Sequence, residues 1–402
     1  MVFSFLKENK QYKKLFLAGM INGMGDRFSQ VAVLAMLLQI TGSGFAVGIT
    51  MALRLLPFLI FAPIGGRLAD RFSRKGILVT TDLARILFAL SFLLVNSKED
   101  IWIVYVSSFV LAVGEAIYAP TRKASIPRLV QKKHLLKVNS LEQVMVGIVL
   151  VGGAFSGGVV SYLFGPNMTF WLNGISFLAA GWLISTITFP EKKENETNQH
   201  HEPVRFSALK KIIMMSVPLQ IILLCEFLIP MINGIDNVLI SVYAVEIYKL
   251  GDFGVGLFYG ALGIGLITSF SVANRLKKHY LSTGLISLML EGVLLILLSK
   301  THFPILAFVI FCFTAFVAGI GNACFDTVLM NEISDEHQGS MFGLLATISN
   351  TMLGISMFLA GSALEFIEPR LLGFIGGISF IFVSLFLIFT FTIKKSRYPA
   401  NE

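Results

Sequence analysis

The chain has 402 residues, a net charge of +8, 55% hydrophobic residues and only 14% charged residues. Soluble domains carry about 25% charged residues, so this chain has too few charges to cover a soluble body and is predicted to be a membrane protein. The 36 Phe residues exclude disorder, and three cysteines that lie singly in apolar stretches exclude a disulfide scaffold or a cysteine-based metal site.

Apolar runs long enough to cross about 30 Å of hydrocarbon recur along the whole chain. We expect twelve membrane-spanning helices, at 14–40, 46–66, 77–96, 101–121, 138–164, 168–189, 214–247, 254–273, 280–299, 304–330, 341–364 and 371–393. The long polar segment 190–212 has the mixed charge of a solvated linker. The sequence therefore predicts an all-α membrane protein with two six-helix bundles, 1–189 and 213–402, joined by a cytoplasmic linker.

Lys and Arg residues predict which side of the membrane each loop faces, because cytoplasmic loops are enriched in both. Most of the 32 Lys and Arg residues fall in loops on the side of the N-terminus. The opposite loops hold Lys98, Lys249, Lys300 and Arg370. Both termini are therefore predicted to be cytoplasmic, and this bias explains the net charge without a nucleic-acid partner.

Short segments of the first half recur in the second half in the same order. Ile21-Asn22-Gly23 recurs as Ile232-Asn233-Gly234, and Arg67-Leu68 recurs as Arg275-Leu276. Each match is weak alone, but their common order and spacing indicate a duplication. Two parallel repeats of six spans are typical of a transporter whose binding site lies between the halves.

The predicted loop at 66–75 reads Gly-Arg-Leu-Ala-Asp-Arg-Phe-Ser-Arg-Lys. It closely resembles the signature loop of the major facilitator superfamily, and it falls on the cytoplasmic side, where that family has it. Gly66 lets two helices approach closely, and Asp70 can act as a latch by pairing with a cation or a helix N-terminus. Arg71 and Arg74 would hold the loop at the anionic leaflet. The resemblance implies the major facilitator fold, with these four residues as part of its gate.

Other segments narrow the resemblance to one branch. Gly25-Asp26-Arg27-Phe28, Arg54-Leu55-Leu56-Pro57 and Tyr118-Ala119-Pro120-Thr121-Arg122 are similar to the macrolide-efflux type of drug exporter, and also to enterobactin exporters and lysophospholipid transporters. The resemblance implies a multi-pass protein of the bacterial cytoplasmic membrane. Such a protein exports hydrophobic or amphipathic molecules, antibiotics among them, by proton antiport.

Two features depart from the drug/proton antiporters. Residues 153–158 read Gly-Ala-Phe-Ser-Gly-Gly where those antiporters have Gly-Pro-x-x-Gly-Gly. The arginine that they carry inside span four is missing, and Glu115 is the charged residue there. Both departures weaken the inference of proton coupling but leave that of transport unchanged.

Ionisable residues at membrane depth cost about 2.5 kcal/mol or more, so each one is a candidate functional residue. Counted along a helix, Asp26, Arg54 and Glu226 fall near the midplane and Asp236 farther out. We expect the three carboxylates to carry protons, with Arg54 adjusting their pKa values. The alternative is that Asp26 is permanently paired with Arg27 or Arg54 and only orients helices.

A second charged group is expected in the cytoplasmic third of the membrane. Asp82 and Arg85 share a helix face, and Glu115 precedes Arg122 by about 10 Å of helix. We expect these residues to pair with one another and with the loop 66–75 as a gate, although static pairing is an equal alternative. Glu291, in span nine, has no assigned role.

The substrate cavity is expected to be mostly apolar with a few polar anchors. Its candidate wall residues are Asn22, Gln30, Gln143, Met145, Asn233, Tyr259, Phe325 and Met352. The 15 methionines suit adaptable binding of varied hydrophobic compounds.

These patterns together predict a monomeric secondary transporter that works by alternating access. Its expected partners are a small hydrophobic or amphipathic substrate, protons and membrane lipids, with no cofactor and no metal. The chain has no Gly-x-x-x-x-Gly-Lys-Ser/Thr loop for ATP and no catalytic Ser/His/Asp or Cys/His set at depth, so we do not expect an enzyme. The alternatives are a lysophospholipid or other lipid flippase on the same fold and a non-transporting receptor or scaffold.

Overall fold

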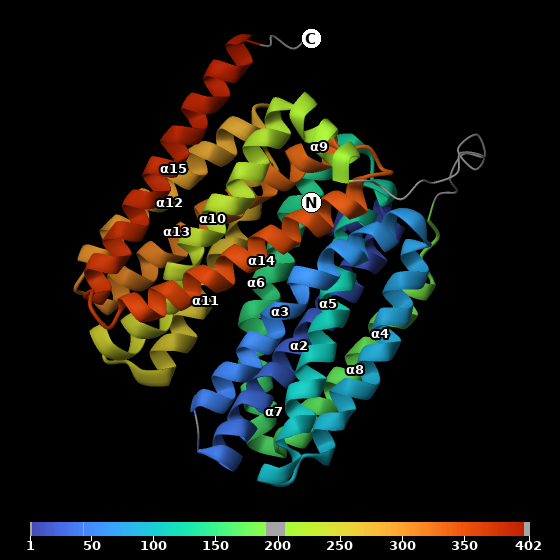
Figure 1. Ribbon diagram of the computed structural model, residues 1–402, viewed down its shortest axis with the longest axis vertical. Coiled ribbons are helices and arrows are strands. Elements are labelled where there is room, and N and C mark those ends of the chain that lie inside the picture. The colour runs from blue at the N-terminus through green and yellow to red at the C-terminus, as the bar shows by residue number, and fades with distance from the viewer. Residues whose placement is uncertain (1, 43, 190–205, 398–402) are drawn as a thin grey trace. The chain divides into compact units, whose positions relative to one another are not determined.

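The computed structural model describes residues 2–42, 44–189 and 206–397, and these residues form helices and connecting turns without any strand (Figure 1). The α-helices are α1 (Val2–Glu8), α2 (Lys10–Thr41), α3 (Gly44–Arg71), α4 (Arg74–Ser91), α5 (Ile101–Leu129), α6 (Leu135–Ile148), α7 (Ala154–Phe164), α8 (Pro166–Ser185), α9 (Phe206–Met215), α10 (Val217–Val242), α11 (Gly251–Ala273), α12 (Tyr280–Lys300), α13 (Pro304–Glu332), α14 (Gln338–Ala363) and α15 (Pro369–Arg397). Most of the predicted linker, 190–205, lies outside the described residues.

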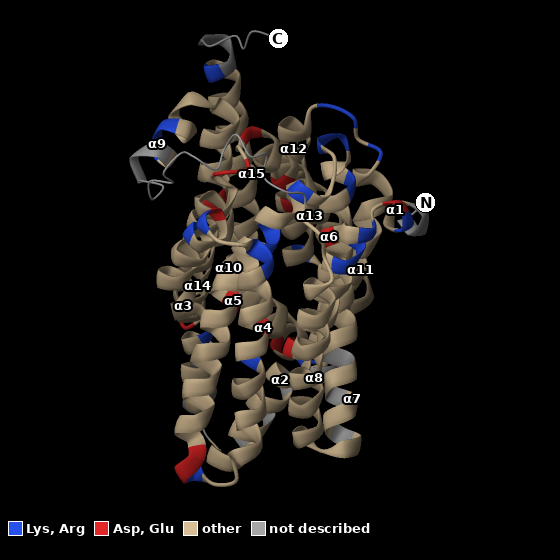
Figure 2. Ribbon diagram, turned by 90° about the vertical axis from the view of Figure 1, so that its right-hand side faces the viewer, with Lys and Arg blue, Asp and Glu red and all other residues tan. Residues whose placement is uncertain are grey.

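Among the described residues, eleven helical segments are long and apolar enough to cross a membrane. They coincide with the second to the twelfth predicted spans. The first predicted span coincides with α2, which carries Lys10, Lys13, Lys14, Asp26 and Arg27 and is not one of the eleven. Figure 2 shows most charged residues near the ends of the long helices. The structure confirms an all-α protein with multiple membrane helices, while the total of twelve and the cytoplasmic termini stay predictions.

The chain divides into two compact units. The first contains the described residues of 1–132, 152–209 and 334–347, and the second those of 133–151, 210–333 and 348–402. Helix α14 therefore contributes to both units. The predicted bundle boundaries at 189 and 213 stay a prediction.

In the first unit, α3 packs on α5, and α2 and α4 pack on α8. A cluster of buried apolar side chains joins α2, α4, α5 and α8, and within it the rings of Phe92 and Phe170 lie 5.2 Å apart. Lipid tails are as apolar as these side chains, so the cluster stabilises the unit through close packing rather than through exclusion of water. The cluster fixes α2, α4 and α5, which carry the charged side chains described below, against α8.

Close helix contacts in the first unit occur at glycines. A Cβ added to Gly153 would lie 2.8 Å from Cβ of Arg27, and one added to Gly157 would lie 2.9 Å from Cα of Phe28. The chain at these glycines passes from the π-helical turn Val149–Gly153 into α7. The glycines of span five therefore let the backbone approach α2 closely.

In the second unit, α12 packs on α13 and α15, α11 packs on α13, and α6 lies against α11 and α13. Asn139 of α6 donates a hydrogen bond to Thr327 of α13, with 3.0 Å between the two atoms. Gly292 of α12 meets Gly377 of α15, where a Cβ on the former would lie 2.6 Å from the latter's carbonyl oxygen. Small residues again set the helix spacing.

Candidate functional site

Helix α4 carries its polar residues on the inside of the first unit. Ser73 caps its N-terminus by accepting a hydrogen bond from the N–H of Gly76. Its buried residues recur every three or four positions, at Arg74, Leu78, Asp82, Arg85 and Ala89. The opposite face is apolar and open, with Leu83 47% and Leu87 72% exposed. This inverted amphipathicity suits a helix whose outer face contacts lipid.

Arg85 is the centre of a buried ion cluster, which we call the Arg85 cluster: Arg85, Asp26, Glu115, Asn22 and Asp82. Nη2 of Arg85 lies 2.6 Å from Oδ2 of Asp26 on α2, and Nη1 lies 3.0 Å from Oε2 of Glu115 on α5. Charge-assisted hydrogen bonds of this length are the strong ones. One guanidinium group therefore joins three helices.

The guanidinium group of Arg85 also stacks on an aromatic ring. Its central carbon lies 4.3 Å from the ring centroid of Phe177 on α8, and such cation–π contacts contribute about 2 kcal/mol when they are desolvated. On α5, Gly114 leaves room for the arginine, because a Cβ added to this glycine would lie 2.8 Å from Cγ and Cδ of Arg85. Neither Phe177 nor Gly114 was singled out in the sequence, where nothing distinguishes them from packing residues.

Asn22 bridges the two polar residues of α4. Its Nδ2 donates to Oδ1 of Asp82 at 2.7 Å, and its Oδ1 accepts from Nη1 of Arg85 at 3.4 Å. This orientation of the amide follows from the chemistry, since an arginine can only donate. Asn22 was predicted to line the substrate cavity, but it is 3% exposed and connects α2 to α4.

The charge pairing differs from the sequence expectation in two ways. Asp26 pairs with Arg85 rather than with Arg27 or Arg54. Arg27 donates a hydrogen bond to Gln30 at 3.2 Å. Arg54 interacts electrostatically with Asp26 and Glu115. Asp26 of the predicted central group joins Asp82, Arg85 and Glu115 of the predicted cytoplasmic group in the Arg85 cluster. Glu226 and Asp236 belong to the second unit. Helix α5 continues to Leu129, so Glu115 lies about 21 Å from that end of the helix, and its depth in the membrane stays a prediction.

The signature loop binds the start of α14. The carboxylate of Asp70 accepts hydrogen bonds from the backbone N–H groups of Gly339 and Ser340, both at 2.7 Å. These are N–H groups that the first turn of a helix leaves without an internal partner, and the helix dipole favours a negative charge there. The structure gives Asp70 both kinds of predicted partner: the N-terminus of α14, and a cation, since Nη2 of Arg74 lies 3.9 Å from its Oδ1.

Gly66 and Arg74 support the same contact. A Cβ on Gly66 would overlap the backbone of Gly339 and would lie 3.1 Å from Cα of Gly343. Arg74 was expected at the lipid headgroups, but it is 3% exposed and donates to the carbonyl groups of Ala124 and Asp335. Its Nε also donates to the carbonyl group of Ala69 in the last turn of α3, where a helix leaves carbonyl groups without an internal partner.

Arg71, the remaining residue of the predicted gate, is exposed. Its position suits the predicted contact with lipid headgroups.

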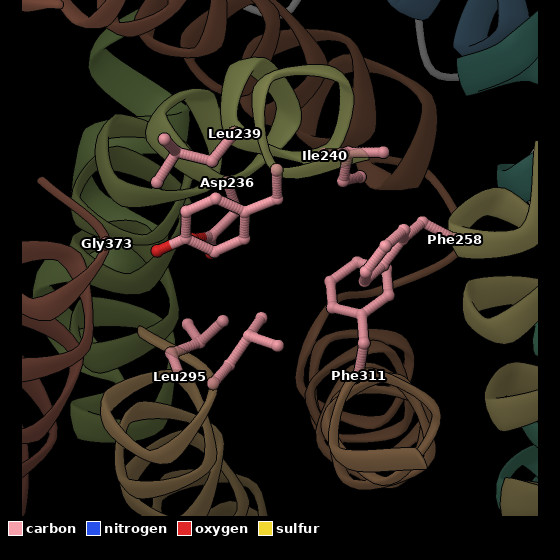
Figure 3. Close-up of a pocket in the computed structure, with 9 residues that line it drawn as sticks. Asp236, Leu239, Ile240, Phe258, Leu295, Phe311 and Gly373 are labelled. Atoms are coloured by element: carbon pink, nitrogen blue, oxygen red, sulfur yellow. The ribbon is translucent and has the colours of Figure 1, made fainter. Parts of the chain in front are cut away.

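The second unit holds the other predicted proton-coupling residues. The carboxylate of Glu226 accepts a hydrogen bond from the hydroxyl of Ser349 on α14. Asp236 is the charged residue in a small cavity lined by apolar side chains, with the rings of Phe258 and Phe311 across from it (Figure 3). Glu291 of α12 interacts electrostatically with Asp236. Asp26 and Glu226 belong to different units, and their role as proton carriers stays a prediction.

The other predicted wall residues divide between buried and partly exposed positions. Met145 and Phe325 are buried, and the Phe325 ring packs against Gly284. The partly exposed ones are Gln30, Gln143, Asn233, Tyr259 and Met352. Their contact with a substrate stays a prediction.

The sequence model of a protein family, described as the Major Facilitator Superfamily, matches residues 15–357 of the chain. Macrolide efflux protein A of Streptococcus pyogenes is 22% identical over 350 residues, which cover 82% of this chain and 84% of the relative. Enterobactin exporter EntS of Salmonella choleraesuis (strain SC-B67) is 23% identical over 396 residues, covering 96% of this chain and 93% of the relative.

Solved structures of transporters share the fold. A bacterial homologue of the iron transporter ferroportin, in its outward-facing state, aligns with a TM-score of 0.73 at 17% identity and covers 95% of this chain and 99% of its own. The fucose:proton symporter FucP of E. coli aligns with a TM-score of 0.70 at 14% identity, and the alignment covers 94% of this chain and 98% of the symporter chain. The matched proteins are transporters rather than enzymes. With the family model matching residues 15–357 and the fold agreeing, the chain belongs to the Major Facilitator Superfamily and is a membrane transporter.

Proposed function

We propose that the protein exports a hydrophobic or amphipathic small molecule across the bacterial cytoplasmic membrane in exchange for protons. The observation that carries this proposal is the Arg85 cluster, in which Asp26 and Glu115 share one arginine inside apolar helices. Ionisable residues inside membrane helices are costly and usually belong to a substrate or proton pathway. The similarity to a macrolide efflux protein and an enterobactin exporter supports the direction of transport.

Protonation of Asp26 would couple proton entry to helix movement. An ionised Asp26 holds α2 to Arg85 of α4 through the hydrogen bond of 2.6 Å. A proton on Asp26 cancels its charge and weakens this bond, because charged hydrogen bonds are about twice as strong as neutral ones. Helix α2 then loses its charged bond to α4, and Glu115 is the remaining ion-pair partner of Arg85 among the described residues.

The contact between Asp70 and α14 would be the gate of the same cycle. The latch joins α3 to the N-terminus of α14 through two hydrogen bonds. Its opening would let the cytoplasmic ends of these helices separate when substrate enters. The Lys and Arg bias of the loops supports a cytoplasmic position for this end of the helices, and for both termini.

Proton movement in proteoliposomes tests the proposal. The purified protein, which we expect to be monomeric, is reconstituted with an interior pH dye under an imposed gradient. A macrolide, a cationic dye and a lysophospholipid are then added in turn. We expect substrate-dependent proton flux that falls by at least about tenfold in Asp26→Asn, whereas the matched variant Glu99→Gln, at an exposed position, keeps the wild-type flux.

Two results would contradict the proposal. Proton flux that survives in Asp26→Asn would remove this residue from the coupling pathway. Movement of lysophospholipid with the proton gradient collapsed, without any proton flux, would identify a lipid flippase instead.

A further inference from the structure

Asp82 is the most deeply buried carboxylate of the Arg85 cluster. The residue is 0% exposed, whereas the side chains of Asp26 and Glu115 are 20% and 38% exposed. Its Oδ1 accepts the hydrogen bond from Asn22. Its Oδ2 is buried and has no hydrogen-bond partner within the described part of the chain.

Arg85 contacts the other two carboxylates rather than Asp82. Both of its terminal nitrogens are engaged, Nη2 by Asp26 and Nη1 by Glu115 and Asn22. Its Nε has no partner among the described residues. Asp82 therefore receives one neutral donor and no ion pair. A carboxylate that is buried with so few donors is unfavourable in its ionised form, so it takes up a proton and becomes a neutral carboxylic acid.

Among the described residues, no cation lies within ion-pair distance of Asp82. The charged or titratable residues that interact electrostatically with it are Asp26 on α2, Arg85 on α4, and Glu115 and Tyr118 on α5. On α8 it faces Gly181, where an added Cβ would lie 3.5 Å from its own Cβ. Arg54 and Arg122 interact electrostatically with Glu115, and Arg27 interacts with Arg54. Arg85 therefore pairs directly with Asp26 and Glu115, and it acts on Asp82 only through electrostatics at longer range.

We propose that Asp82 holds a proton in this arrangement and is a proton carrier of the cluster. The release of this proton follows from the position of Arg85, which is one helical turn from Asp82 on the same face of α4. When Arg85 leaves Asp26 and Glu115, its guanidinium group can pair with Asp82. The O–H bond of Asp82 then breaks, the proton passes to water, and the carboxylate that remains is stabilised by the arginine.

Asn22 would be the positioning residue for this exchange. Its amide contacts Asp82 and Arg85 at the same time, so a movement of α2 alters both contacts together. The role of Asp82 as a carrier rests on the proposed function, while its protonation does not.

Infrared spectroscopy of the purified full-length protein tests the protonation directly. Aspartate labelled with ¹³C at the side-chain carboxyl group identifies the C=O band of a protonated aspartate at neutral pH. The Asp236→Asn background removes the other deeply placed aspartate of an apolar helix. We expect a labelled band that persists in Asp26→Asn and disappears in Asp82→Asn.

The same series contains the contradicting outcomes. A band of unchanged size in Asp82→Asn, or one lost in Asp26→Asn and retained in Asp82→Asn, would overturn the proposal. Protonated aspartate and asparagine have the same charge and nearly the same shape, so failure of Asp82→Asn to fold would also count against it. Asp82→Ser, which keeps an acceptor for Asn22, must lack the band as well.

A separate measurement distinguishes this proposal from the proposed function. Substrate is added to the detergent-solubilised protein, and a pH dye measures the protons released. We expect Asp82→Asn to lose the release seen in the wild type. If the wild type couples no protons to transport but Asp82→Asn still lacks the infrared band, the proposed function fails and the protonation of Asp82 stands.

Discussion

Removal of Arg85 should destabilise the first unit by leaving two carboxylates without their cation. In Arg85→Leu, Asp26 and Glu115 lose bonds of 2.6 and 3.0 Å, and the ring of Phe177 loses its stacking partner. Loss of one partner of a buried ion pair costs about 3–5 kcal/mol. The side chains of Asp26 and Glu115 are 20% and 38% exposed, so water relieves part of this cost. We expect the free energy of unfolding to fall by about 3 kcal/mol, the lower end of that range.

The triple variant Arg85→Leu, Asp26→Asn, Glu115→Gln isolates the cause. It removes both uncompensated charges and leaves an apolar side chain against Phe177. A neutral amide costs less to bury without a partner than an unpaired carboxylate does, so we expect the triple variant to recover most of the stability that Arg85→Leu loses. Unfolding in mixed micelles, followed by the fluorescence of the 3 Trp residues, measures both variants. If the triple variant is no more stable than Arg85→Leu, the unpaired carboxylates are not the cause of the destabilisation. Altered packing around residue 85 would then be its cause.

The remaining predictions concern the contact between α3 and α14. Asp70→Asn keeps one acceptor oxygen for the two N–H groups and loses the charge at the helix N-terminus. We therefore expect a loss of about 1–2 kcal/mol in the free energy of unfolding and slower transport. Unfolding and substrate flux measure the two effects, and unchanged values would show that the contact contributes to neither stability nor transport. Gly66→Ala would place a methyl group against the backbone of Gly339, and we expect a loss of transport measured by substrate flux. The matched control, Gly76→Ala, has its nearest neighbour 3.7 Å away at Ser73 and should transport normally; equal activity in both variants would exclude the steric argument.

Local properties of the sequence determined the elements of the fold. Hydropathy over windows of membrane length located the spans that the described residues confirm, because a helix in lipid satisfies its own backbone hydrogen bonds and needs no distant partner. The loop 66–75 determined the family in the same way, since its residues are contiguous. That Asp70 can act as a latch followed from its residue type, but its contact with the start of α14, 269 positions away, is set by tertiary structure.

The partners of the charged residues were decided by tertiary structure. Asp26 and Arg85 are 59 positions apart, and the sequence offered Arg27 and Arg54 as equally good partners. Arg85 brings Glu115 and Asp26 together, although the sequence assigned the two carboxylates to different depths. Nothing local indicated that Asp82 would be the carboxylate left without a cation. Pairing within a membrane depends on which helix faces meet and at what height, and packing between helices sets both.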